Sequence, residues 1–349
     1  MKLTKSVRRW ATLPAALVLL LTLVMLPTPV LADPAVPIGA EGAYNSDLTK
    51  GPFDTVDEGA EFWVKINVGS SGDPLTDFDA ADYLITYDTS VLSVDLTLVS
   101  GHYEVTSGHI ANGDIGASGP TGIPNVPVVQ TREIGAHGSG VIKVVNNVAG
   151  YTGLDGYGYL CAIKFTVTGS DGNDGNITPS QVTLSDTGAN EIATETPTAE
   201  TINVDKLEVT GISVVGEGAT NEGYVSDGDT TTFTMTATVT GGCAAFTGAT
   251  PYDWAFDTGG SGTDPSSSAT VNDVTYSSSD TKNITVTVTD DLGSTSVMAS
   301  SPTGCVAKVY NTFTFSFTQD RTEGIKGDTR ATHDNTIAFD STAGEGKSP

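Results

Sequence analysis

The chain has 349 residues and carries 42 acidic against 16 basic side chains, giving a formal net charge of −26. A balance this acidic repels nucleic acid and anionic membrane surfaces, so it argues against both as partners. Hydrophobic residues make up 38% of the chain and aromatic residues 7%, which is enough to build folded cores.

Residues 1–32 have the organisation of a secretion signal, with a basic start, an apolar run at Leu13–Leu26 and a small-residue cleavage point at Ala32. The apolar run is shorter than the roughly 20 residues that span a bilayer, so we expect cleavage rather than an uncleaved anchor helix. The mature chain would hold 12 basic and 42 acidic residues, a net charge of −30. We predict a secreted protein, extracellular or at the cell surface, with no membrane insertion after cleavage.

The following region, residues 33–205, shows the two-residue period of β-strands and no helical period. Its three clearest strands place apolar residues on one side and polar residues on the other. These apolar residues are Phe62, Val64, Ile66 and Val68, then Tyr83, Ile85 and Tyr87, and then Cys161, Ile163, Phe165 and Val167. A strand with one apolar face must cover another apolar sheet, so the sequence predicts an all-β sandwich.

The rest of this region is less periodic. Residues 101–140 are rich in Gly and Pro, and we expect a variable, irregular segment there. Val141–Val145 and Val182–Leu184 are predicted strands. Residues 171–177 are similar to a calcium-binding loop, but glycine at the fifth position and Val182 at the twelfth break the required register. A polar turn between strands is the favoured interpretation.

The order of these features resembles a cohesin domain, a nine-stranded jelly roll that captures dockerin modules in cellulosome-type assemblies. The resemblance covers about residues 35–205. It rests on Gly59-Ala-Glu-Phe-Trp-Val64, Tyr83-Leu-Ile-Thr-Tyr-Asp-Thr-Ser-Val-Leu92, Gly158-Tyr-Leu-Cys-Ala-Ile-Lys-Phe-Thr-Val167, Asp186-Thr-Gly188 and Ile202-Asn-Val204. It implies a dockerin-like protein partner. Carbohydrate-binding sandwiches of the same superfamily are similar at this level, so a polysaccharide-binding protein, or an accessory part of a secreted glycan-degrading system, is the alternative.

A second β region follows a short polar joint at 205–208. Two of its strands alternate apolar residues with threonine, and an aromatic motif lies between them. The residues are Phe233, Met235, Ala237 and Val239, then Tyr252, Trp254 and Phe256, and then Ile284, Val286 and Val288. With the strand end Asp290-Asp-Leu-Gly293, this region resembles a PKD-type immunoglobulin-like sandwich over about 207–309. Ala255 and Asp257 depart from the family's Trp-Asp-Phe-Gly pattern.

These observations divide the chain into four parts. We expect a signal peptide at 1–32, a cohesin-like sandwich at 33–205, a PKD-type sandwich at 206–310 and a tail at 311–349. The tail contains Thr336-Ile-Ala-Phe339, which resembles the opening strand of a further β repeat.

Three cysteines in an exported chain allow one bridge. Cys161 lies on the same strand face as Ile163 and Phe165, so we predict a buried free thiol. Cys243 and Cys305 flank the second β region, and we predict a disulfide between them. A loop of about 63 residues gives a stabilisation of about 4 kcal/mol in the chain-entropy account.

No catalytic centre, metal site or cofactor is predicted, and we interpret the chain as a non-enzymatic binding or scaffold protein. No serine has a nucleophile-elbow motif, and the histidines lack the compact spacing typical of metal ligands. Acidic residues are too numerous for counting to exclude glycoside chemistry, but neither β region resembles a fold with a deep cleft.

Two sets of residues are candidates for binding. The cohesin resemblance assigns partner contacts to the strand that ends at Asp88. Since Tyr83, Ile85 and Tyr87 share one face of that strand, Asp82, Leu84 and Thr86 point the opposite way. Trp63 lies on the polar side of its strand and is a candidate platform for stacking on a sugar ring, the simpler expectation being a tryptophan covered by the preceding segment.

Overall fold

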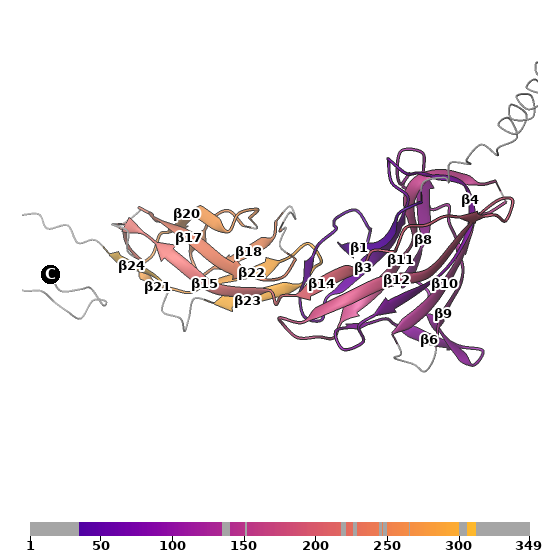
Figure 1. Cartoon of the computed structure of the whole chain (residues 1–349). Helices are drawn as coiled ribbons and strands as arrows, with labels where there is room; N and C mark the ends of the chain where they lie inside the picture. Colours follow the sequence, from indigo (N-terminus) through magenta and orange to yellow (C-terminus); the bar gives the residue numbers. More distant parts are fainter. Residues whose placement is uncertain are drawn as a thin grey trace, which may run out of the picture.

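The computed structural model describes residues 35–134, 140–150, 152–217, 221–225, 229–243, 246, 250–264, 266–299 and 306–311. Figure 1 shows two β units arranged end to end. We call β1–β14 the first sandwich and β15–β24 the second β unit. The predicted all-β class is confirmed. Within the described residues, no helix has the length and apolar character needed to cross a membrane.

The first sandwich contains long strands that form two layers, together with several short ones (Figure 1). They are β1 (Ile38–Tyr44), β2 (Thr55–Val56), β3 (Glu61–Val68), β4 (Leu75–Tyr87), β5 (Leu92–Ser93), β6 (Leu96–Val99), β7 (His102–Val105), β8 (Ile110–Gly116), β9 (Val128–Glu133), β10 (Val141–Asn147), β11 (Leu154–Val167), β12 (Asp174–Asp186), β13 (Glu191–Ile192) and β14 (Glu200–Val204).

One layer has the strand order β1–β3–β11–β8, and the other has the order β9–β10–β4–β12–β14. Strand β11 begins beside β4 in the second layer and then continues between β3 and β8 in the first, so the layers are joined at one end. This jelly-roll arrangement of long, one-sided strands agrees with the sandwich that the sequence predicts.

The core lies between the layers and is built from the alternating apolar residues. In the register of β3 with β11, Phe62 lies opposite Phe165 and Val64 opposite Ile163. The Phe62 and Phe165 ring centroids are 6.1 Å apart, and the Tyr87 ring meets Phe165 edge-on at 5.5 Å. Each of these side chains is almost completely buried. Such aromatic burial supplies much of the energy that holds two sheets together.

The prediction of an irregular segment at 101–140 is wrong for much of its length, because it contains β7, β8 and β9. Strand β8 includes Asn112, Gly113 and Asp114, which weaken the periodic signal. A Cβ atom at Gly113 would lie 2.3 Å from the carbonyl oxygens of Tyr159 and Leu160, so the close approach of β11 requires glycine there. A residue that breaks the sequence pattern is therefore needed by the sheet.

Strand β12 is also longer than the predicted strand at 182–184. It begins at Asp174, inside the polar turn predicted at 171–177, so only the first residues of that segment form a turn. It also has a register shift between Ser180 and Thr183. Gln181 has a positive φ of 48° in this irregularity. The shift interrupts the two-residue period, which explains why the sequence showed only the second part of the strand.

The second β unit has its own hydrophobic core and follows the link at 205–207. Its strands are β15 (Glu208–Val215), β16 (Glu222–Val225), β17 (Thr231–Thr240), β18 (Tyr252–Phe256), β19 (Gly260–Ser261), β20 (Thr270–Tyr276), β21 (Asp280–Lys282), β22 (Ile284–Thr289), β23 (Thr295–Ala299) and β24 (Ala307–Asn311). The sheet β15–β17–β20–β19 lies beside two three-stranded sheets, β18–β22–β23 and β16–β24–β21. Trp254 is only 1% exposed and lies in this core.

Candidate functional site

The outward side of β9, β10, β4 and β12 presents polar and aliphatic side chains, and we call it the open face. On β4, the side chains of Tyr83 and Ile85 are fully buried, so Asp82, Leu84 and Thr86 point outward, as the alternation predicts. All aromatic residues of these four strands point away from it. They are Phe78, Tyr83 and Tyr87, each buried in the core.

Neighbouring strands extend the open face on both sides of β4. Leu84 lies between Lys143 of β10 and Ser180 of β12, while Thr86 lies between Val141 and Thr178. Beyond β10, Arg132 and Gln130 of β9 continue the same rows. The three predicted residues are therefore surrounded by hydroxyl and aliphatic side chains on one side and by the longer Lys143 and Arg132 on the other.

Asp82 already has a partner on the open face. Its Oδ2 lies 2.9 Å from Lys143 Nζ, and the two side chains are 49% and 41% exposed. An ion pair this exposed contributes little to stability because water competes for both groups. The structure thus brings together Asp82, Leu84 and Thr86, while their role in binding stays a prediction.

The outward side of β1, β3 and β11 has a different character, and we call it the aromatic face. Lys65 Nζ lies 3.7 Å from the centroid of the Tyr44 ring and 5.3 Å from that of Tyr159. The same ammonium group donates a hydrogen bond of 3.1 Å to the Leu48 carbonyl. Burial lowers the pKa of Lys65, and the charge of Glu41 opposes that shift. Burial and the hydrogen bond to Glu41 raise the pKa of Tyr44.

Trp63 lies at the end of the aromatic face nearest the second β unit. In the sheet register, it is between Tyr44 of β1 and Lys164 of β11. Trp63 is half-buried and lines a cavity of about 870 Å³, which we call the junction cavity. The loop at 45–50 contributes part of the cavity wall, so the preceding segment adjoins Trp63 without covering it completely.

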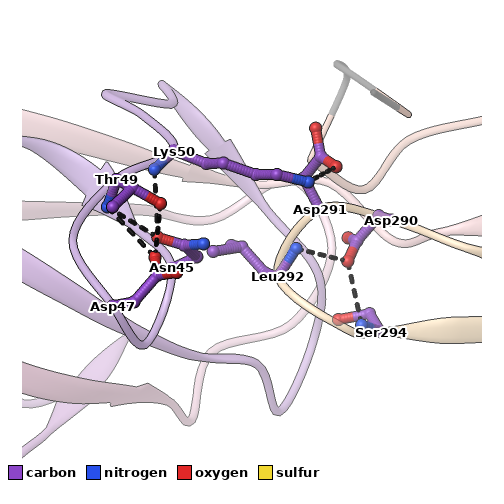
Figure 2. A network of polar contacts seen from close by, with 8 residues as sticks. All are labelled: Asn45, Asp47, Thr49, Lys50, Asp290, Asp291, Leu292 and Ser294. Atoms are coloured by element: carbon purple, nitrogen blue, oxygen red, sulfur yellow. Dashed lines mark hydrogen bonds and ion pairs between the residues drawn. The ribbon is translucent and has the colours of Figure 1, made fainter. Parts of the chain in front are cut away.

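The wall of the junction cavity is completed by the second β unit (Figure 2). Lys50 Nζ reaches Asp291 Oδ1 at 2.9 Å, and the Asp291 side chain is 1% exposed. Asn45 Oδ1 accepts hydrogen bonds from the backbone N–H groups of Thr49 and Lys50, which fixes the loop that carries Lys50. A second link joins Thr55 Oγ1 to the Gly242 carbonyl at 2.9 Å.

Asp290 organises the opposite wall. Its carboxylate accepts hydrogen bonds from the backbone N–H groups of Leu292, Ser294 and Cys243. Burial nevertheless raises the pKa of Asp290, since desolvation outweighs these hydrogen bonds. Leu292 in turn packs against the core of the first sandwich. The turn at 289–295 is therefore anchored to both units.

A small network of hydrogen-bonded polar side chains lies within the core of the first sandwich. The Tyr83 hydroxyl lies 2.9 Å from Asn146 Oδ1 and 3.1 Å from Cys161 Sγ, and Asn146 Nδ2 donates to the Leu160 carbonyl. Cys161 is a buried free thiol, as predicted. Burial raises the pKa of Cys161 to about 12, so it is not a reactive nucleophile near neutral pH.

The remaining sequence predictions concern cysteines and metals. Cys243 is buried, but Cys305 lies outside the described residues, so the predicted bridge stays a prediction. The predicted signal at 1–32 and most of the predicted tail also lie outside them. Of the candidate metal ligands, His102 pairs with Glu104 at 2.7 Å. Within the described part of the chain, no three His, Cys, Asp or Glu residues gather as metal ligands.

Comparison with known proteins finds a family model that matches most of the first sandwich. Residues 52–204 match the family model described as Cohesin domain, which confirms the cohesin resemblance for this segment. Cohesin domains are non-catalytic modules that bind dockerin partners. The match does not include the second β unit, whose PKD-type resemblance stays a prediction. No curated protein matches the chain.

Several solved cohesin structures are similar to this chain. A non-cellulosomal cohesin from Archaeoglobus fulgidus has 16% identity and a TM-score of 0.34, with coverage of 49% of this chain and 91% of that one. A cohesin module from a family 33 glycoside hydrolase of Clostridium perfringens has 13% identity, a TM-score of 0.34 and coverage of 49% and 99%. A type II cohesin domain from the cellulosome of Acetivibrio cellulolyticus has 14% identity, a TM-score of 0.31 and coverage of 49% and 96%.

Proposed function

We propose that the first sandwich binds a dockerin-like protein partner through the open face, and that the chain is a secreted or cell-surface scaffold protein without catalytic activity. The observation that carries this proposal is the composition of the open face. Its outward side chains are polar or aliphatic, and the aromatic residues of its four strands are buried. A surface of polar and aliphatic side chains suits a protein partner, whereas binding polysaccharide would favour a row of exposed aromatic rings.

Asp82, Leu84 and Thr86 form the centre of this binding surface. Leu84 offers apolar contact area. Thr86 is exposed and lies opposite Thr178 of β12. Asp82 offers a carboxylate of which Lys143 engages one oxygen, Oδ2. The remaining oxygen can accept a charge-assisted hydrogen bond from the partner.

The other parts of the chain fit this role as proposals of their own. Residues 1–32 direct export, residues 33–205 form the binding module, and residues 206–310 form a PKD-type spacer that places the module away from its anchoring point. Cys243 and Cys305 form the bridge that stabilises the spacer. Residues 311–349 are a tail, or the start of a further β repeat.

The test uses the chain without residues 1–32, first in a pull-down against secreted proteins and insoluble polysaccharides in parallel. With a captured partner, Asp82→Ala is expected to weaken binding by about 1.5–3 kcal/mol, because a charge-assisted hydrogen bond is lost at a desolvated centre. Thr86→Arg should abolish binding by steric obstruction.

The matched control is Thr166→Arg, which places the same side chain outward on the other layer. It should leave the affinity unchanged. An affinity that responds equally to Thr86→Arg and Thr166→Arg, or not at all to Asp82→Ala, would place the binding surface elsewhere.

A further inference from the structure

Trp63 is placed differently from Tyr44 and Tyr159 of the aromatic face. Tyr44 and Tyr159 are 6% and 8% exposed and enclose the Lys65 ammonium. Trp63 keeps part of its surface exposed, and that surface lines the junction cavity. No polar contact of its indole N–H exists among the described residues. An aromatic ring beside an open cavity, with an unused donor, is suited to a ligand that combines apolar and polar surfaces.

The junction cavity is held in shape from both sides. The Lys50–Asp291 ion pair and the hydrogen bond from Thr55 to Gly242 fasten the first sandwich to the second β unit at its border. Leu292 inserts its side chain against the first core. These contacts are made between residues of the chain itself, so the fold holds the two walls together. The volume of about 870 Å³ lies within the range of small-molecule sites.

The charges of the cavity indicate which ligands fit. Acidic residues outnumber basic ones along its walls, and each basic residue is already paired: Lys164 with Glu61, and Lys50 with Asp291. An anionic ligand would therefore be repelled. The Asp290 carboxylate accepts hydrogen bonds from three backbone N–H groups. Its charge is therefore already stabilised and does not require a cationic ligand. Neutral ligands with many hydroxyl groups fit this environment best.

We propose that the junction cavity binds a short segment of neutral glycan, with one pyranose ring stacked on Trp63 and its hydroxyl groups bonded to the polar walls. The ring presents C–H groups on one side, which suit an aromatic face, and hydroxyl groups around its edge, which suit carboxylate and amide oxygens. This site is separate from the open face, so the chain would hold a protein partner and a glycan at the same time.

The experiment uses the chain without residues 1–32 and a panel of soluble hexasaccharides. The probes are cellohexaose, mannohexaose and N-acetylchitohexaose as neutral chains and hexagalacturonate as an anionic chain. Binding is measured by calorimetry and by tryptophan fluorescence. The fluorescence reports on the site directly, because Trp254 is buried in the second core and Trp63 is the other tryptophan beyond residue 32.

At least one neutral hexasaccharide is expected to bind and to change the Trp63 emission, whereas hexagalacturonate binds at least tenfold more weakly. Trp63→Ala should weaken binding of the neutral chain at least tenfold, and Trp63→Phe should restore part of the affinity. The control is Tyr224→Ala, which removes a 42% exposed aromatic side chain from the second β unit and should change nothing. Circular dichroism and melting temperature establish that each variant is folded.

The proposal is overturned when no neutral hexasaccharide binds the folded wild-type chain, when Trp63→Ala binds as well as wild type, or when hexagalacturonate binds more tightly than the neutral chains. Its outcome is independent of the protein-binding proposal. Asp82→Ala should keep full glycan affinity, and Trp63→Ala should keep full affinity for a protein partner.

Discussion

The two outer faces of the first sandwich differ in what covers them. The open face presents polar and aliphatic side chains around Leu84, with the aromatic residues of its strands turned inward. On the aromatic face, Tyr44 and Tyr159 lie outward but are nearly buried, whereas Trp63 remains partly exposed at the junction cavity.

The difference shows that alternation along a strand decides which side a residue takes, but not whether that side meets solvent. Thr86 points outward from β4 and is exposed, whereas Tyr44, which points outward from β1 after a register shift between Glu41 and Tyr44, is buried. Side chains that face outward from the first layer therefore stabilise the fold, and those that face outward from the second layer are available to a partner.

The largest effect is expected from removing Tyr44. Tyr44→Ala should lower the free energy of unfolding by about 3 kcal/mol, because a large buried ring, its contact with Lys65 and its hydrogen bond to Glu41 are all lost. Leu84→Ala on the open face should lower it by no more than about 1 kcal/mol, since that side chain is already partly exposed. Urea denaturation measures both, and equal losses would remove the distinction between the faces.

The next effect concerns the border between the two units. Lys50→Met removes the lysine that pairs with the buried Asp291 carboxylate. We expect the free energy of unfolding to fall by about 2 kcal/mol. This is less than for a fully buried ion pair, because the Lys50 side chain is 41% exposed. Denaturation followed separately by Trp63 and Trp254 should show a loss that both probes record. A change of less than about 0.5 kcal/mol would mean that the pair does not fasten the units together.

How much of this could be read from the sequence depends on how local each feature is. Alternation alone predicts that Phe62, Tyr83 and Phe165 point inward. It also predicts that Asp82 points outward. The junction cavity does not, because the loop at 45–50 and the turn at 289–295 come together only after both units have folded. Gly113 shows a third case, in which a residue that weakens the strand pattern is required by the neighbouring strand.

Alkaline pH provides an effect of intermediate size that is specific to the core between the two faces. Burial raises the pKa of Cys161 from its usual value of 9.0 to about 12. Between those values the unfolded chain loses the thiol proton while the folded chain keeps it, so stability falls as pH rises. From pH 8 to pH 10 this contribution amounts to about 1.4 kcal/mol.

The measurement compares the wild type with Cys161→Ala over that pH range. Both proteins contain buried tyrosines with a raised pKa, such as Tyr83 and Tyr276, and these destabilise both at high pH. The fall in stability should therefore be about 1.4 kcal/mol smaller in the variant. Equal slopes would show that the Cys161 thiol ionises as readily in the folded chain as in the unfolded one.

The smallest effect on stability is expected from the ion pair at the centre of the open face. Asp82 and Lys143 are 2.9 Å apart, yet their side chains are 49% and 41% exposed. A double-mutant cycle with Asp82→Asn and Lys143→Met should give a coupling energy in unfolding of no more than about 0.5 kcal/mol, because water screens both charges. A carboxylate that contributes so little to the fold can exchange its lysine for a group of the partner at little cost.

Lys143→Met should accordingly change the affinity for a protein partner less than threefold, while Asp82→Ala weakens it at least tenfold. A coupling energy above about 1 kcal/mol would instead make Asp82 a structural residue of the sheet. In that case the loss of binding in Asp82→Ala would report on the shape of the open face rather than on a direct contact.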